Sequence, residues 1–66
     1  RDNTNLYYER GLAYQNLEEH DLAIADFTKA IELDPNHANA YWNRGLARFM
    51  VDQRGLAVMD LGKVAK

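Results

Sequence analysis

Few residues of this chain could do chemistry alone, and none stands in a pattern that enzymes use. The two histidines, His20 and His37, lack the further ligands at helical spacing that a zinc motif such as H-E-x-x-H requires. Cysteine and serine are absent, which removes the common nucleophile–histidine pairs. The adjacent carboxylates Glu18 and Glu19 suit the start of a helix electrostatically. We therefore predict no catalytic residue, no metal and no cofactor, and we interpret both histidines as solvated turn residues.

Length and charge limit the architecture and the partners. The 66 residues make one small domain, residues 1–66, with a net charge of −2 and with Lys and Arg scattered singly. Nucleic-acid binders usually carry a clustered basic face, so no nucleic-acid partner is expected. No apolar run approaches the roughly 18 residues of a membrane span, and no signal-like segment is present. We expect a soluble module, compatible with the cytoplasm, although the compartment itself is not indicated. The absence of an initial methionine suggests a piece of a longer or processed protein.

An internal repeat dominates the chain. The segment Tyr7–Ala13 returns as Tyr41–Ala47, at an offset of 34 residues. Laying residues 4–32 on residues 38–66 gives 10 identities in 29 pairs, where unrelated segments would share roughly two. The identities include Arg10/Arg44, Gly11/Gly45 and Asp26/Asp60. Repeats at such a period indicate stacked copies of one helical unit, here about residues 4–37 and a truncated second unit of about residues 38–66.

The pattern of each unit predicts two helices joined by a tight turn. We expect helices over about 5–17, 21–33, 39–51 and 54 to the chain end. Asn3 or Thr4 is the expected N-cap of the first helix and Asp21 that of the second. Pro35 ends the second helix because proline disfavours helical geometry in the residue before it. So short a turn makes the helices antiparallel, and the returning glycine of each first helix suggests close approach of another helix.

These residues resemble the tetratricopeptide repeat family, whose pattern is W-x2-L-G-x2-Y…A-x3-F…P. The first unit is similar through Tyr7, Gly11, Tyr14, Phe27 and Pro35, together with Ala23. The second unit departs from the pattern at Arg48, where tyrosine is usual, and has Leu61 for the aromatic residue. Glu18 and Asp52 replace the usual turn glycine. The resemblance implies an all-α fold of two antiparallel helical hairpins, stacked in a right-handed sense.

The resemblance also implies a function, because in this family the first helix of each unit lines a concave groove that holds a peptide or helix. The expected function is a non-enzymatic protein–protein interaction module, a scaffold or adaptor. The eight positions that would face the groove, called the groove residues below, are Tyr8, Leu12, Gln15, Asn39, Trp42, Asn43, Leu46 and Phe49. Some members hold a C-terminal carboxylate with Lys and Asn, but Tyr8 and Leu12 stand at the matching places of the first unit, so no such clamp is expected. The alternative is that Trp42, Phe49 and Met50 merely pack on a neighbouring repeat.

The predicted fourth helix is apolar on every side, which is expected of a buried helix. Its expected interface residues are Leu56, Met59, Leu61 and Val64. Something must cover them, and the candidates are a following repeat, a second copy of the chain or a swapped helix. We therefore expect a homo-oligomer or neighbouring repeats. The second functional reading follows from this, namely a purely structural solenoid or oligomerisation segment with no ligand of its own.

Overall fold

The computed structural model describes residues 4–65, which form four helices and no strand. Helix α1 spans Thr4–Asn16, α2 spans His20–Leu33, α3 spans Ala38–Met50 and α4 spans Arg54–Ala65. Each predicted helix is present, with ends that differ from the prediction by about one residue. The predicted all-α class is confirmed.

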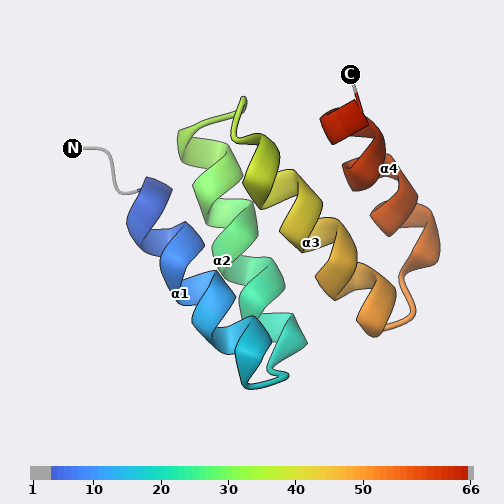
Figure 1. Ribbon diagram of the computed structural model, residues 1–66, viewed down its shortest axis with the longest axis horizontal. Helices are drawn as coiled ribbons and strands as arrows, with labels where there is room; N and C mark the ends of the chain where they lie inside the picture. Colours follow the sequence, from blue (N-terminus) through green and yellow to red (C-terminus); the bar gives the residue numbers. More distant parts are fainter. Residues whose placement is uncertain (1–3, 66) are drawn as a thin grey trace.

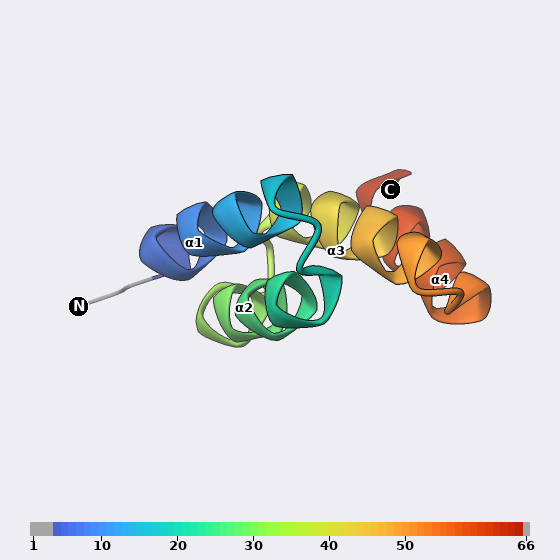
Figure 2. The ribbon, with the colours of Figure 1, turned by 90° about the horizontal axis from the view of Figure 1, so that it is seen from below.

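The helices form two antiparallel hairpins, α1–α2 and α3–α4, that follow one another along the chain (Figure 1). Helix α2 packs against both α1 and α3, whereas α4 packs against α3. Seen from below, α2 lies beneath α1 and α3, which form a layer of their own (Figure 2). The Cα atoms span 33 × 29 × 13 Å, so the molecule is flat and thin. The first helix of each unit therefore presents a face on the same side of the molecule.

The turn inside each hairpin uses a left-handed residue. Glu18 has φ 61° and Asp52 has φ 67°, and both stand at the position where the resemblance implies a turn glycine. A side chain in this conformation costs roughly 1–2 kcal/mol because its Cβ crowds the backbone. Both units accept this cost at the same place, so the turn geometry is set by the hairpin and not by the local residue.

The structure corrects the predicted N-cap of the second helix. The second helix begins at His20, one residue before Asp21, and its N-cap is Glu19, which makes no side-chain capping hydrogen bond. The reason is the early chain reversal at Glu18, after which the Glu19 carbonyl accepts from Ala23 N at 3.0 Å. Thr4 lies inside α1, and its hydroxyl donates to the Ala30 carbonyl at 2.9 Å. The alternative cap, Asn3, falls outside the described residues.

The repeated glycines mark close helix contacts, as their recurrence predicts. A Cβ on Gly11 would lie 2.7 Å from the ring of Phe27, the largest fully buried side chain. A Cβ on Gly45 would lie 2.9 Å from Leu61 and 3.2 Å from the Ala57 carbonyl oxygen. Small residues thus let α1 approach α2, and α3 approach α4, with one large side chain filling the space. This close approach fixes the orientation of α1 and α3, and therefore the orientation of the groove residues that they carry.

Candidate partner-binding surface

The groove residues divide into two groups by exposure. Asn39, Trp42, Leu46 and Phe49 are exposed, and Tyr8, Leu12, Gln15 and Asn43 are half-buried. The exposed apolar members all belong to α3, where Trp42, Leu46 and Phe49 recur at the i, i+4, i+7 spacing of one helix face. Helix α3 therefore contributes most of the apolar surface, and α1 contributes a partly covered neighbouring row.

Tyr8 connects the two first helices. Asn43 donates from Nδ2 to the Tyr8 hydroxyl at 3.1 Å, and a second bond from the same amide reaches the Asn39 carbonyl at 2.9 Å. The Tyr8 ring lies 5.9 Å from the ring of Phe27 and 4.7 Å from that of His37. Tyr8 thus belongs partly to the core, which explains its half-buried state, and its hydroxyl sets the spacing of α1 and α3 across the surface.

A hollow of about 510 Å³ opens between the carboxyl-terminal halves of α1 and α3. It is lined by Gln15, Asn16, Glu18, His20, Leu46, Phe49 and Met50. Three of these are groove residues. The other four were not predicted as site residues, although Glu18 and His20 stand in or beside the turn that follows α1, and such a turn must lie at the end of the groove. Three apolar side chains and one carboxylate form the wall, together with amides and an imidazole.

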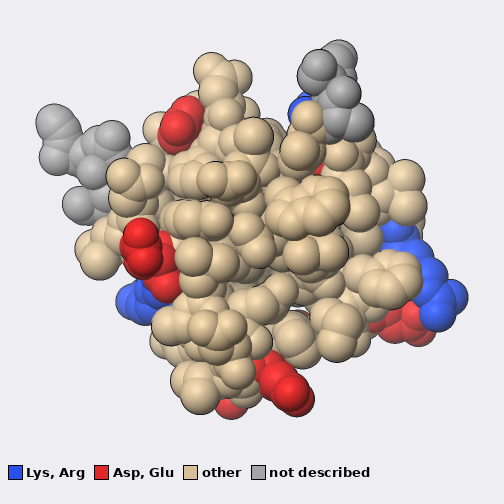
Figure 3. Space-filling view, in the orientation of Figure 1, with Lys and Arg blue, Asp and Glu red and all other residues tan. Residues whose placement is uncertain are grey.

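Charge is distributed at the margins of this surface. Figure 3 shows the face that carries α1 and α3, with an uncharged centre and with Lys, Arg, Asp and Glu at its edges. The lining of the hollow contains Glu18 and no Lys or Arg. An exposed apolar centre with a polar rim is the usual composition of a protein-binding surface.

Two buried aspartates lie on the other side of the first helices, and each is paired with an arginine. Arg10 donates to Asp26 through Nε and Nη2, both at 2.8 Å. Arg44 does the same to Asp60 at 2.9 and 2.8 Å. The hydrogen bond from Arg10 to Asp26 raises the pKa of Arg10 above its ordinary value. These four residues are identities of the repeat, but the sequence analysis did not predict them as pairs. The signal that could have indicated the pairs is the equal separation of 16 residues between arginine and aspartate in both units.

The second pair carries extra contacts. Arg48, which stands where the first unit has Tyr14, also donates to Asp60 at 2.8 Å. Arg44 donates through Nη1 to the Thr28 hydroxyl of α2 at 3.1 Å, so it joins the two units. These ionic groups position α3 against its neighbours and stand apart from the groove residues.

Both histidines differ from the prediction of solvated turn residues. His37 is the N-cap of α3, where Nδ1 accepts from Ala40 N at 3.2 Å while the ring contacts Tyr8. His20 is the first residue of α2, and its Nδ1 lies 3.1 Å from Gln15 Oε1. Both are half-buried because the turns that carry them fold back on α1. Within residues 4–65, no three His, Asp or Glu side chains gather as a metal site would require.

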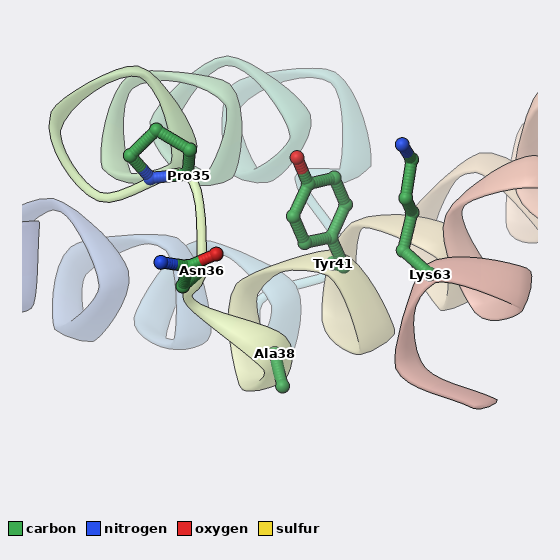
Figure 4. A pocket seen from close by; sticks show the side chains of 5 residues that line it. All are labelled: Pro35, Asn36, Ala38, Tyr41 and Lys63. Carbon is green, nitrogen blue, oxygen red and sulfur yellow. The ribbon is translucent and has the colours of Figure 1, made fainter. Parts of the chain in front are cut away.

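A second, smaller hollow of about 300 Å³ lies beside the turn between α2 and α3 (Figure 4). Pro35 and Asn36 of the turn, Ala38 and Tyr41 of α3, and Lys63 of α4 line it. The Tyr41 and Lys63 side chains point the same way into this space, side by side. One ammonium and one phenol on an open surface make no chemical site.

The predicted interface residues of α4 occupy different environments. Leu56 and Met59 are exposed, whereas Leu61 and Val64 are half-buried. Leu61 packs over Gly45, so it serves the contact inside the second hairpin.

No helix among the described residues has the length and apolar character that crossing a bilayer demands.

Comparison with known proteins identifies the first unit. A sequence model of the tetratricopeptide repeat, a family of interaction modules that are typically non-catalytic, matches residues 4–37, which is 34 of the 66 residues. Searches of curated proteins and of solved structures gave no significant match. The match covers more than half of the chain, and the fold is the one that the family implies. The chain therefore belongs to the tetratricopeptide repeat family.

Proposed function

We propose that this chain is a non-enzymatic protein-interaction module, a scaffold or adaptor, that holds a peptide or a partner helix against the groove residues. The observation that carries the proposal is the exposed apolar row Trp42, Leu46 and Phe49 on α3, which ends at the 510 Å³ hollow. Moving large apolar side chains out of water is favourable, so a continuous exposed row favours the binding of a partner that covers it.

The chemistry of the hollow defines the class of partner. Its apolar wall suits a bulky apolar side chain, for which its volume leaves ample room, and the single charge in its lining, Glu18, favours a basic residue next to that anchor. The rest of the partner lies along Trp42 and Leu46 toward Tyr8. An amphipathic segment with one Leu, Met or Phe anchor and a neighbouring Lys or Arg meets these requirements.

The test is a selection of displayed random peptides on the wild-type chain, followed by titration of the selected peptides. Trp42 is the only tryptophan, so its emission reports binding directly. We expect the selected peptides to carry the apolar and basic pair. Phe49→Ala should weaken their binding by about 2 kcal/mol, the usual effect of removing an anchor.

Leu22→Ala is the matched control, measured by calorimetry beside Trp42→Ala. Leu22 lies on α2 and is 47% exposed, against 45% for Trp42 on α3. We expect Trp42→Ala to lose affinity and Leu22→Ala to keep it, with helicity unchanged in both. Selected peptides that bind Trp42→Ala and Phe49→Ala as tightly as wild type would contradict the assignment of the surface.

A further inference from the structure

The internal repeat allows each surface of one unit to be compared with its counterpart in the other. Residues 34 apart occupy the same place in their hairpins. Helix α3 is covered on one side by α2, whereas no described helix precedes α1. A residue that is buried on α3 and exposed on α1 therefore marks the surface that a preceding hairpin covers.

Three positions on α1 show this difference. Leu6 is 64% exposed, whereas its counterpart Ala40 is fully buried in a cluster with Ala30 and Ile31 of α2. Ala13 is exposed, whereas its counterpart Ala47 is fully buried. The third position is the arginine, and the Arg10 side chain is 57% exposed against 13% for Arg44. Leu6, Arg10 and Ala13 form one stripe, called the α1 stripe below.

Helix α4 carries the complementary stripe. On α2, Thr28 is the residue that bonds Arg44, and the counterpart of Thr28 on α4 is Gly62. A Cβ added to Gly62 would meet no neighbouring atom within 4 Å. Ile24, one turn before Thr28, is half-buried, and its counterpart Val58 is 67% exposed. Val58 and Gly62, called the α4 stripe below, therefore repeat on α4 the helix face that carries Ile24 and Thr28 on α2, from which Thr28 bonds Arg44 of α3.

We propose that a second copy of this chain packs its α4 stripe on the α1 stripe of the first, in the arrangement by which α2 packs on α3. The contact is heterologous, since it joins two different surfaces, and it leaves one free stripe at each end of the pair. Such a contact continues into longer rows, and it places the α1 of one copy beside the α3 of the next. The face that carries the groove residues is then continuous from copy to copy.

Two of the predicted interface residues of α4 stand apart from the α4 stripe. Leu56 and Met59 are the counterparts of Leu22 and Ala25, and both of those remain exposed although a following hairpin packs on α2. Leu56 and Met59 therefore lie outside the copy contact, which distinguishes it from an isologous dimer formed by two α4 helices.

The test uses two variants that each block one stripe. Ala13→Glu places a carboxylate on the α1 stripe, and Val58→Glu places one on the α4 stripe. Sedimentation velocity on the wild-type chain, at concentrations up to about 1 mM, should show a mean mass that keeps rising with protein concentration. Each variant alone should be monomeric, and an equimolar mixture should form a one-to-one dimer that grows no further.

Circular dichroism should show that both variants keep their helices, and Met59→Glu serves as a matched control on the exposed side of α4. Met59→Glu should assemble like the wild-type chain. The proposal is overturned if the wild-type chain stays monomeric, if Ala13→Glu alone still dimerises, or if the mixture remains monomeric. A dimer of Ala13→Glu that Met59→Glu abolishes would instead show the isologous contact.

A gain of affinity provides a second test. Gly62→Thr gives the α4 stripe the hydroxyl that Thr28 presents to Arg44, and Arg10 of the neighbouring copy would bond it. We expect association to become about tenfold tighter, the effect of one hydrogen bond to a charged group. Gly55→Thr is the matched control, because it also lies on α4 with free space around it but outside the stripe. An equal effect of the two substitutions would overturn the proposal.

Discussion

Asp26 and Asp60 occupy the same place in the two units, yet their surroundings differ. Both carboxylates are buried. Asp26 accepts two hydrogen bonds from Arg10, whose side chain is largely exposed, whereas Asp60 accepts from Arg44 and Arg48, whose side chains are mostly buried. Arg48 Nε is itself buried without a hydrogen-bond partner among the described residues. The second unit therefore holds two arginines that depend on one carboxylate, because arginine replaces the tyrosine of the first unit.

At the residue scale, we predict that Asp60→Ala destabilises the chain more than Asp26→Ala. Removing Asp60 leaves two largely buried guanidinium groups unpaired, which costs about 3 kcal/mol or more. Removing Asp26 leaves Arg10 free to turn to water, so its loss should cost clearly less than the loss of Asp60. Urea unfolding followed by circular dichroism measures both. Equal losses would show that the burial of the arginines does not matter.

At the scale of the elements, four glycines stand in helices but only two of them have a contact to protect. Gly11 and Gly45 allow close approach to Phe27 and Leu61, whereas Gly55 and Gly62 have open space around them. The sequence alone shows the difference only through recurrence, because Gly11 and Gly45 match at the 34-residue offset and the other two do not. Helix α4 thus carries two glycines that lower its helix propensity without a packing reason.

We predict opposite effects of two alanine substitutions on thermal stability. Gly62→Ala should stabilise the chain by about 1 kcal/mol, because alanine loses less backbone entropy in a helix. Gly11→Ala should destabilise it by about 1–3 kcal/mol despite the same gain in propensity, because the methyl group overlaps the buried ring of Phe27. Calorimetric unfolding of both variants checks this. Stabilisation by Gly11→Ala would mean that α1 and α2 can move apart at little cost.

At the scale of the whole molecule, support is unequal between the two units. Helix α2 packs against both α1 and α3, and its stripe of Ala23, Phe27 and Ala30 is fully buried. Helix α4 contacts α3 among the described helices and keeps Leu56, Val58 and Met59 exposed. A helix supported on one side opens at a lower free energy than one held on two sides.

We predict that amide hydrogen exchange is fastest in α4 among the four helices. Amides of residues 61–64 should exchange before those of residues 25–31, because α4 can detach from α3 while α2 stays packed on α1. Exchange measured by NMR at low protein concentration reports this for the single copy. Slower exchange at residues 61–64 than at residues 25–31 would contradict it.

The sequence by itself determined the number, order and approximate ends of the helices and the family of the fold. The 34-residue recurrence carries this information, because periodic apolar positions, small residues at contacts and Pro35 act locally. Only the tertiary structure decided which repeated residues meet. The Arg10–Asp26 and Arg44–Asp60 pairs, the capping by His37 and the positive φ of Glu18 depend on how hairpins pack. The same is true of the exposed stripes, because exposure depends on which helix lies alongside, and the repeat pattern is the same whether that helix is present or absent.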